Sequence, residues 1–306
     1  MIHIQNLIDA VGLGAVFALI AVGIGLVFGV LRLINFAYGQ LIMLAAYALA
    51  FTDSWPDAAS ILLAVLVAVV ASLLMERIAF RPLRTADPST MLVATFALAY
   101  LLENVAVVQY AYRQQGGLGD PIGTLAQLNQ AVTIGSLHIR WVSFLAIGAG
   151  IVSLGGLALL LNRTMIGLQM RAASMDFRTA RLLGVRADTV IMAAVAVSGV
   201  LAAVAAVVLS ISSTSVNQTT GLYETLFVLV GVVAGGIDRL ASATLGGFAI
   251  GFAISIVGAE LPSSGGTPFT SNAYMPSVIY LAVIVALLLR PAGLFSRAGR
   301  GSVERV

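Results

Sequence analysis

The sequence predicts an all-α protein, a polytopic membrane helix bundle with about 8–10 transmembrane helices, because a crossing takes about 20 apolar residues. Of the 306 residues, 60% are hydrophobic and 9% are charged, and the mean hydropathy is +1.03. A soluble domain carries about 25% charged residues. At the observed charge density, a soluble fold of this length would lack a solvated surface.

The apolar segments follow one another along the whole chain, which we expect to form one transmembrane domain, residues 1–306. Full crossings are predicted at residues 7–30, 58–75, 91–110, 141–161, 189–211 and 274–289. Residues 36–51 are short for a crossing and predict a broken or re-entrant helix. Residues 225–236 and 241–257 form a short, glycine-interrupted pair, a pattern that marks discontinuous helices near a transport path.

Glycines spaced four apart predict close contacts between helices. The pairs are Gly25 with Gly29, Gly231 with Gly235, and Gly247 with Gly251. General glycine tolerance in membrane helices is the alternative for each pair taken singly.

All basic residues are arginines, and their placement predicts the orientation of the chain. Arginines concentrate in loops that alternate with the crossings, most densely in residues 163–188, and also in the tail 290–306. Only Arg113 and Arg140 fall on the other side. The positive-inside rule therefore predicts a multi-pass protein of the cytoplasmic (inner) membrane with a cytoplasmic C-terminus.

Composition also excludes several kinds of chemistry. Without lysine there is no P-loop and no lysine Schiff base, and without cysteine there are no disulfides or thiolate ligands. His3 and His138 are too few for a histidine metal site. We therefore expect no metal, no cofactor and no enzymatic activity. The net charge of +3 follows from membrane topology and does not indicate a nucleic-acid partner.

Residues 167–185, GLQMRAASMDFRTARLLGV, predict a short cytoplasmic amphipathic helix. One side would carry small and apolar residues, and the adjoining face arginines: Met170, Ala173, Phe177, Ala180 and Gly184, and then Arg171, Arg178 and Arg181. Three interpretations are open for such a helix: contact with membrane lipid, an ordinary positive-inside loop, or docking into a groove on a soluble partner.

This segment, with the pattern G…RA…D…A…LGV, resembles the coupling segment of permeases of branched-chain amino acid ABC importers. Further stretches resemble the same family in the same order along the chain. They are LINFAYGQ at 33–40, ERIAFRPLR at 76–84, VVAGGIDRLASATLGGFAIG at 232–251 and LLLRPAGLF at 287–295. The resemblance covers nearly the whole chain.

The resemblance implies a permease subunit that translocates branched-chain or related amino acids. It implies as partners two ABC ATPase subunits, a paralogous permease subunit and an extracytoplasmic solute-binding protein. It assigns the coupling to the ATPase to Gly167, Arg171, Ala172, Asp176, Phe177, Arg178, Ala180 and Gly184. Arg171 and Asp176 would orient the docking helix, and Gly184 would end it.

Several residues depart from the family pattern and leave the substrate open. Tyr38 stands where the family often has histidine, and Gln40 where it often has an acid. Residues 238–241 replace a Gly-Ser-Ile-Pro turn, and a lysine common within 222–230 is missing. A permease for urea, short amides or a sugar would share this architecture. An ion-coupled secondary transporter is the other alternative.

Polar residues inside crossings are costly and are candidates for function. Glu103 and Asn104 lie about 18 Å along their helix from Met91 at 1.5 Å per residue, in the outer half of the membrane. Glu103 either faces the pathway and meets a substrate ammonium group, or makes a structural contact. Asn35, Tyr38 and Gln40 either line a vestibule or cap a broken helix.

Overall fold

The computed structural model describes residues 2–52, 55–84, 86–113, 120–121, 129, 131–134, 137–213, 215–216, 218–237, 239–260 and 275–289. The longer helices are α1 (Ile2–Leu31), α2 (Tyr38–Phe51), α3 (Asp57–Met75), α5 (Pro88–Arg113), α6 (Trp141–Arg163), α9 (Ala187–Ser213), α10 (Leu222–Gly235), α11 (Leu240–Glu260) and α12 (Met275–Leu289). Shorter helices are η1 (Glu76–Phe80), α4 (Arg81–Leu83), α7 (Met165–Met175) and α8 (Phe177–Leu182). The predicted tail 290–306 lies outside the described residues.

The prediction of an all-α membrane bundle is confirmed. Among the described residues, 6 helices are long and apolar enough to cross a membrane. They contain residues 5–31, 57–83, 89–108, 141–163, 187–213 and 240–259. The helices α2 and α10 are short, as expected, but α11 has 21 residues and is long enough to cross, so the expectation of a short second member of that pair was wrong.

Strand pairs occur within the predicted polar segments. Strands β2 (Ala131–Ile134) and β3 (Leu137–Arg140) pair antiparallel, with Val132 opposite Ile139. The β-branched residues Val132, Thr133 and Ile134 favour this conformation. Strands β1 (Asp120–Pro121) and β4 (Ser215–Val216) form a second antiparallel pair.

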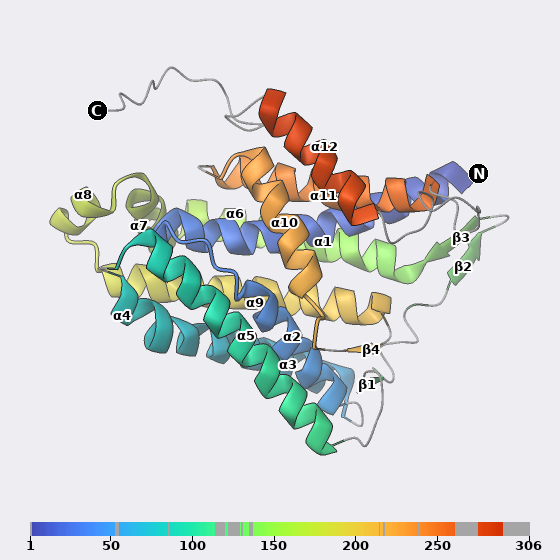
Figure 1. Cartoon of the computed structure of the whole chain (residues 1–306), viewed down its shortest axis with the longest axis horizontal. Helices are drawn as coiled ribbons and strands as arrows, with labels where there is room; N and C mark the ends of the chain where they lie inside the picture. Colours follow the sequence, from blue (N-terminus) through green and yellow to red (C-terminus); the bar gives the residue numbers. More distant parts are fainter. Residues whose placement is uncertain are drawn as a thin grey trace.

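Helix α1 is the centre of the bundle (Figure 1). Its apolar window is 83% buried, and it packs against α6, α9 and α11. Helix α2 is enclosed by α3 and α9, whereas α5 and α6 lie outside, with 17% of their apolar windows buried. The pair β2–β3 lies at the end of the bundle where α1 begins, and α7 and α8 lie at the other end (Figure 1).

Small residues let α10 and α11 approach closely, as the glycine pattern predicts. A methyl group added to Gly231 would lie 2.8 Å from the carbonyl oxygen of Gly246, and one added to Gly235 would lie 2.9 Å from the Cα of Gly246. Helix α11 meets α1 through its other side, where a methyl group on Gly251 would lie 2.8 Å from the carbonyl oxygen of Leu13. By contrast, a methyl group added to Gly29 would lie 3.8 Å from the Cβ of Ser174, which is an ordinary van der Waals contact.

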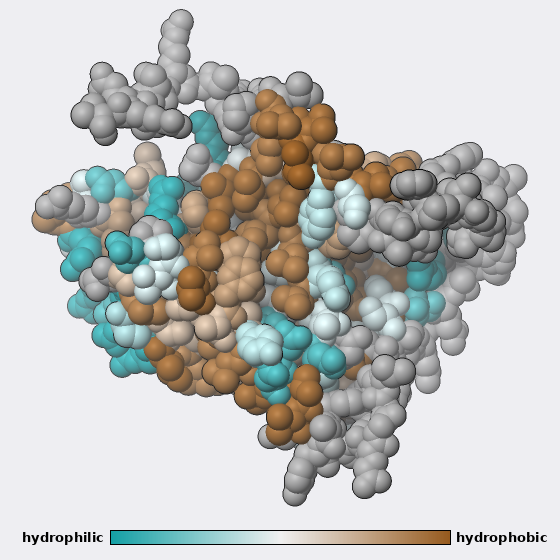
Figure 2. Space-filling view, in the orientation of Figure 1, coloured by the Kyte–Doolittle hydropathy of each residue, from teal (hydrophilic) through white to brown (hydrophobic). Residues whose placement is uncertain are grey.

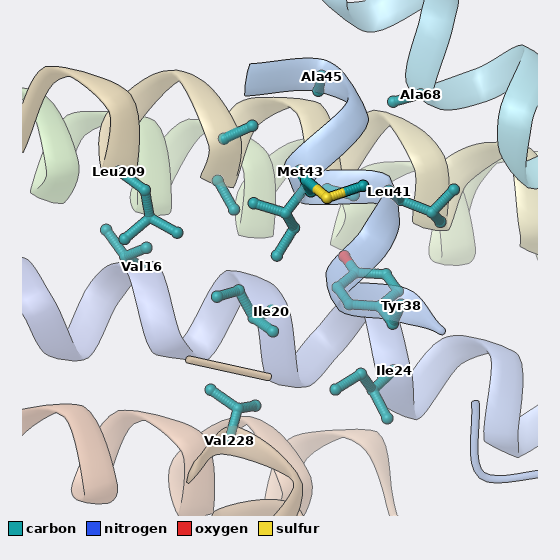
Figure 3. Close-up of a cluster of buried hydrophobic side chains, with 14 of the residues drawn as sticks. Val16, Ile20, Ile24, Tyr38, Leu41, Met43, Ala45, Ala68, Leu209 and Val228 are labelled. Atoms are coloured by element: carbon teal, nitrogen blue, oxygen red, sulfur yellow. The ribbon is translucent and has the colours of Figure 1, made fainter. Parts of the chain in front are cut away.

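The interior is a continuous cluster of apolar side chains around α1 and α2 (Figure 3). Tyr38 lies among Ile20 and Ile24 of α1 and Met43 of α2. Outside, apolar side chains cover the middle of the molecule in the view of Figure 2, and hydrophilic ones gather at the end where α7 and α8 lie. This distribution suits a bundle whose middle is surrounded by lipid.

Candidate functional site

The predicted coupling segment begins with a sharp turn out of α6. Thr164 caps α7: its Oγ1 accepts a hydrogen bond of 3.0 Å from the Gly167 N–H. Gly167 packs directly on the backbone of Leu160 and Leu161, where any side chain would overlap. Threonine at the cap and glycine at the contact therefore fix how α7 leaves the bundle.

The segment is helical, but the single helix drawn over residues 167–185 is wrong, because the chain breaks at Asp176. Asp176 is extended, with φ −149°, and its Oδ1 accepts a hydrogen bond of 3.1 Å from the Thr179 N–H. An aspartate that caps a helix competes with continuation of the preceding one. Asp176 therefore ends α7 and starts α8.

Gly184 terminates the second helix. It adopts φ +89°, a left-handed conformation that costs glycine little. The Val185 N–H donates to the Ala180 carbonyl at 3.1 Å, and the Gly184 N–H to the Arg181 carbonyl at 3.1 Å. These two bonds form a Schellman motif, which satisfies carbonyl groups at a helix end.

The apolar side predicted for this segment faces the bundle. Met170 and Ala173 are buried in a cluster with residues of α1 and α9, Ala180 is buried, and Phe177 is half-buried. Arg32, which follows α1, donates through Nη2 to the carbonyl oxygen of Ser174 at 2.8 Å. This segment is thus attached to both α1 and α9.

The opposite side exposes large apolar residues that the sequence interpretation did not single out. We name this patch the exposed coupling surface after the predicted coupling segment on which it lies. It comprises Met165, Leu168, Met175, Leu182 and Leu183, with exposed fractions of 75%, 54%, 86%, 84% and 81%. The predicted coupling residues Arg171 and Asp176 are exposed beside it, and Ala172 is half-buried. Arg171 donates to Asn162 Oδ1 at 3.1 Å. The backbone of Arg178 belongs to α8, and its side chain lies outside the description.

Charged groups connect the first arginine-rich loop to the start of α9. Arg84 forms salt bridges with Glu76, at the start of the π-helical turn η1, and with Asp188. Glu76 is 1% exposed. Among the described residues, no group of three or more His, Cys, Asp or Glu side chains is arranged to hold a metal ion.

The predicted pathway residues around α2 are buried. The Tyr38 hydroxyl donates to the Ser198 carbonyl oxygen of α9 at 3.3 Å. Asn35 Oδ1 accepts from the Ala37 N–H at 3.0 Å, just before α2 begins. The Gln40 amide is fully buried and has no hydrogen-bond partner among the described residues.

The other two pathway candidates lie on the outer helix α5. Glu103 is half-buried, and Asn104 is exposed and donates to the Tyr100 carbonyl oxygen at 2.7 Å. The structure therefore groups Asn35, Tyr38 and Gln40 near the start of α2, and the α5 pair belongs to a different helix. None of these five predicted pathway residues lines the cavity that lies near the start of α1.

That cavity has a volume of about 350 Å³. It lies between α1, α6, α9, α10 and α11 at the end opposite α7 and α8, and its charged lining residues are Asp9, Arg140 and Glu224. Ser143 Oγ donates to Asp9 Oδ1, and Glu224 Oε2 accepts from the Gly221 N–H at 3.0 Å. Asp9 is an acid within the first predicted crossing, so the rule applied to Glu103 was also a signal for Asp9.

Comparison with known proteins identifies the family. Residues 6–288 match the family described as branched-chain amino acid transport system / permease component. The chain belongs to this family. Its branched-chain amino acid permease relatives include the high-affinity branched-chain amino acid transport system permease protein BraD of Pseudomonas aeruginosa, 28% identical over 99% of this chain and 98% of BraD.

Further relatives match over similar lengths. The permease protein LivH of the corresponding high-affinity system in Escherichia coli K12 is 27% identical over 99% of this chain and 97% of LivH. A probable branched-chain amino acid transport permease protein LivH of Methanocaldococcus jannaschii is 26% identical over 90% and 87%. The solved structure of PsaBC from Streptococcus pneumoniae in complex with Fab aligns over 95% of this chain at 15% identity, with a TM-score of 0.48.

Proposed function

We propose that this chain is the permease subunit of an ATP-binding cassette importer for branched-chain or related amino acids in the cytoplasmic membrane. Its partners in this proposal are two ATPase subunits, a paralogous permease subunit and an extracytoplasmic solute-binding protein. The full-length similarity to BraD and LivH supports the substrate class. Since the chain has no lysine for a P-loop, a partner chain hydrolyses the ATP.

The exposed coupling surface is the observation that carries the docking of an ATPase. Its apolar side chains lie at the arginine-rich end of the bundle, on helices of 11 and 6 residues and, for Leu183, on the turn that follows α8. Both helices are too short to cross a membrane. Burial of one leucine side chain is worth about 1.5–3 kcal/mol. Exposed apolar side chains on short helices fit a groove on a partner protein.

The anchoring of α7 gives the docking a mechanical consequence. Arg32 ties the carbonyl of Ser174 to the end of α1, and Met170 packs in the cluster that α1 and α9 share. In the proposed cycle, closure of the ATPases displaces α7 and α8, and these contacts shift α1 and α9 with them. The coupling residues Arg171, Asp176 and Phe177 hold the two helices in the geometry that the ATPase meets.

Leucine removal from the exposed coupling surface tests the docking. The double variant Leu182→Ser/Leu183→Ser leaves the fold intact because both side chains are more than 80% exposed. It should lose about 3–6 kcal/mol of docking energy, which weakens ATPase binding more than a hundredfold. The readouts are co-purification of the ATPase and stimulation of ATP hydrolysis.

Ile78→Ser is the matched control, since Ile78 is 71% exposed in η1, outside the coupling segment. It should leave both readouts unchanged. Normal ATPase binding and stimulation in the double variant would overturn the docking assignment. The surface would be assigned to lipid instead if the double substitution abolished vesicle binding by a peptide of residues 163–188 but left ATPase binding by the whole protein intact.

Substrate class and energy source are tested in proteoliposomes that hold the assembled transporter with its binding protein. We expect ATP-dependent uptake of leucine, isoleucine or valine, and none of urea, a short amide or a sugar. Uptake that continues without ATP and stops with a protonophore would indicate a secondary transporter. Uptake of the non-amino-acid compounds alone would replace the proposed substrate.

A further inference from the structure

The cavity lined by Asp9, Arg140 and Glu224 carries a further inference, which rests on the proposed import of amino acids. We propose that this cavity binds the transported amino acid as a zwitterion with an apolar side chain. It lies at the end of the bundle opposite α7 and α8, the end that the arginine distribution places outside the cell. A substrate released by a binding protein would arrive at this end.

The size of the cavity suits one amino acid. Its volume is about 350 Å³, near the lower limit of about 300–1,000 Å³ typical of small-molecule sites. A peptide or a disaccharide would need a larger space. The lining comes from α1, α6, α9, α10 and α11 and from Arg140 at the end of β3, so the site lies where these helices converge.

The charged groups of the cavity match both ends of a zwitterion. Arg140 offers a fork of N–H donors that fits a carboxylate in a bidentate manner. Asp9 uses Oδ1 for the Ser143 hydroxyl, and Glu224 uses Oε2 for the Gly221 N–H. A carboxylate has about four lone-pair sites, so each of these groups can also accept a hydrogen bond from an ammonium group.

These three side chains are not paired with one another. Among the described residues, no salt bridge includes Asp9, Arg140 or Glu224. Asp9 and Glu224 are partly buried, and a carboxylate that is removed from water is stabilised when it meets an opposite charge. A ligand with one ammonium and one carboxylate would supply a partner to both signs at once.

The rest of the lining selects for an apolar side chain. Phe17 of α1, Leu209 of α9, Phe227 of α10 and Ile254 of α11 form the apolar part of the wall. A branched aliphatic side chain would bury its surface against these residues at about 25 cal/mol per Å². Urea and neutral sugars have no charge for Arg140 or the acids.

Direct binding tests the site. The complete membrane complex is placed in nanodiscs without binding protein or ATP, and radiolabelled leucine is the probe. Competitors are isopentylamine, which is leucine without its carboxylate, and isocaproate, which is leucine without its ammonium group. Two variants change the cavity: Arg140→Gln removes its arginine, and Ser212→Trp fills it from α9. The control variant is Arg77→Gln, at the opposite end of the bundle.

The wild-type complex and the Arg77→Gln control should bind leucine more tightly than either analogue. Arg140→Gln should weaken leucine binding about tenfold to hundredfold, because a hydrogen bond to a charged group is lost, and should leave isopentylamine binding unchanged. Ser212→Trp should abolish leucine binding. A merely structural role of Arg140 would weaken both compounds equally and would overturn the inference.

Two further results separate this inference from the proposed function. If the wild-type complex binds no leucine without the binding protein, yet imports leucine with ATP, the cavity site is wrong and the importer stands. If Ser212→Trp binds leucine as the wild type does, the site is likewise elsewhere. Absence of amino acid uptake by the complete transporter would instead refute the importer.

Discussion

Replacement of Arg84 by methionine should destabilise the protein far more than neutralisation of Asp188, although both belong to one ion cluster. Arg84 bridges Glu76 and Asp188. The side chain of Glu76 is 2% exposed and that of Asp188 56% exposed. Without Arg84, the Glu76 carboxylate stays buried with no countercharge, whereas water can solvate Asp188.

The magnitudes follow from this difference in burial. Arg84→Met should cost about 3–5 kcal/mol, as expected for an uncompensated buried charge. Asp188→Asn should cost about 0.2–1 kcal/mol, as for exposed ion pairs. The double variant Glu76→Met/Arg84→Met should return to within about 1.5 kcal/mol of the wild type, because no charge stays buried and the side-chain volumes are similar.

The assay is helical circular dichroism during titration with SDS in mixed micelles, which gives an apparent free energy of unfolding for each variant. The double-mutant cycle isolates the pair energy of Glu76 and Arg84. Equal losses in Arg84→Met and Asp188→Asn would refute the argument from burial. A double variant as unstable as Arg84→Met would also refute it.

Three other predictions concern the backbone and the interior. Gly246→Ala should separate α10 from α11, because the new methyl group would overlap the Gly231 carbonyl oxygen. The free energy of unfolding in the same SDS titration should fall by about 1–3 kcal/mol. An unchanged midpoint would contradict this prediction. Gly184→Ala should lower the stability of the helix end by about 1 kcal/mol, because alanine tolerates φ +89° less well than glycine does. The loss should appear as faster amide hydrogen exchange in α8, and unchanged exchange there would argue against a strained cap. Tyr38→Phe should lose the hydrogen bond to Ser198, which should lower the free energy of unfolding by about 0.5–1.5 kcal/mol and leave transport unchanged. Abolished transport with normal stability would make Tyr38 a pathway residue.

The arrangement of the coupling segment shows how far sequence reasoning reached. The arginines and helical periodicity located the segment, and the structure agrees that it is helical and that Gly184 lies at its end. The periodicity predicted one helix, but the hydrogen bond that Asp176 Oδ1 accepts from the Thr179 N–H divides the segment into two helices. The helical side with Met170 and Ala173 faces the bundle, so Leu182 and Leu183, which the pattern gave no reason to select, are exposed.

The cavity shows what depends on tertiary contacts. Asp9, Glu224 and the neighbouring residues Arg140 and Ser143 come from three distant parts of the sequence, and of these only Asp9 stood out as an acid within a predicted crossing. Glu103 was the more conspicuous acid because it lies deep in a crossing. Its helix, α5, is an outer one, so depth along a single helix did not predict proximity to the cavity.

Composition and spacing by themselves determined that the chain is a membrane helix bundle and which segments are helical, and they predict that a partner supplies any ATP hydrolysis. These follow from local quantities: apolar run length, arginine placement and missing residue types. The tertiary structure decided which side of each helix faces inward and which polar groups meet. Those outcomes depend on close backbone approaches, such as Gly231 to Gly246 and Gly251 to Leu13, that fix the rotation of α11 against its neighbours.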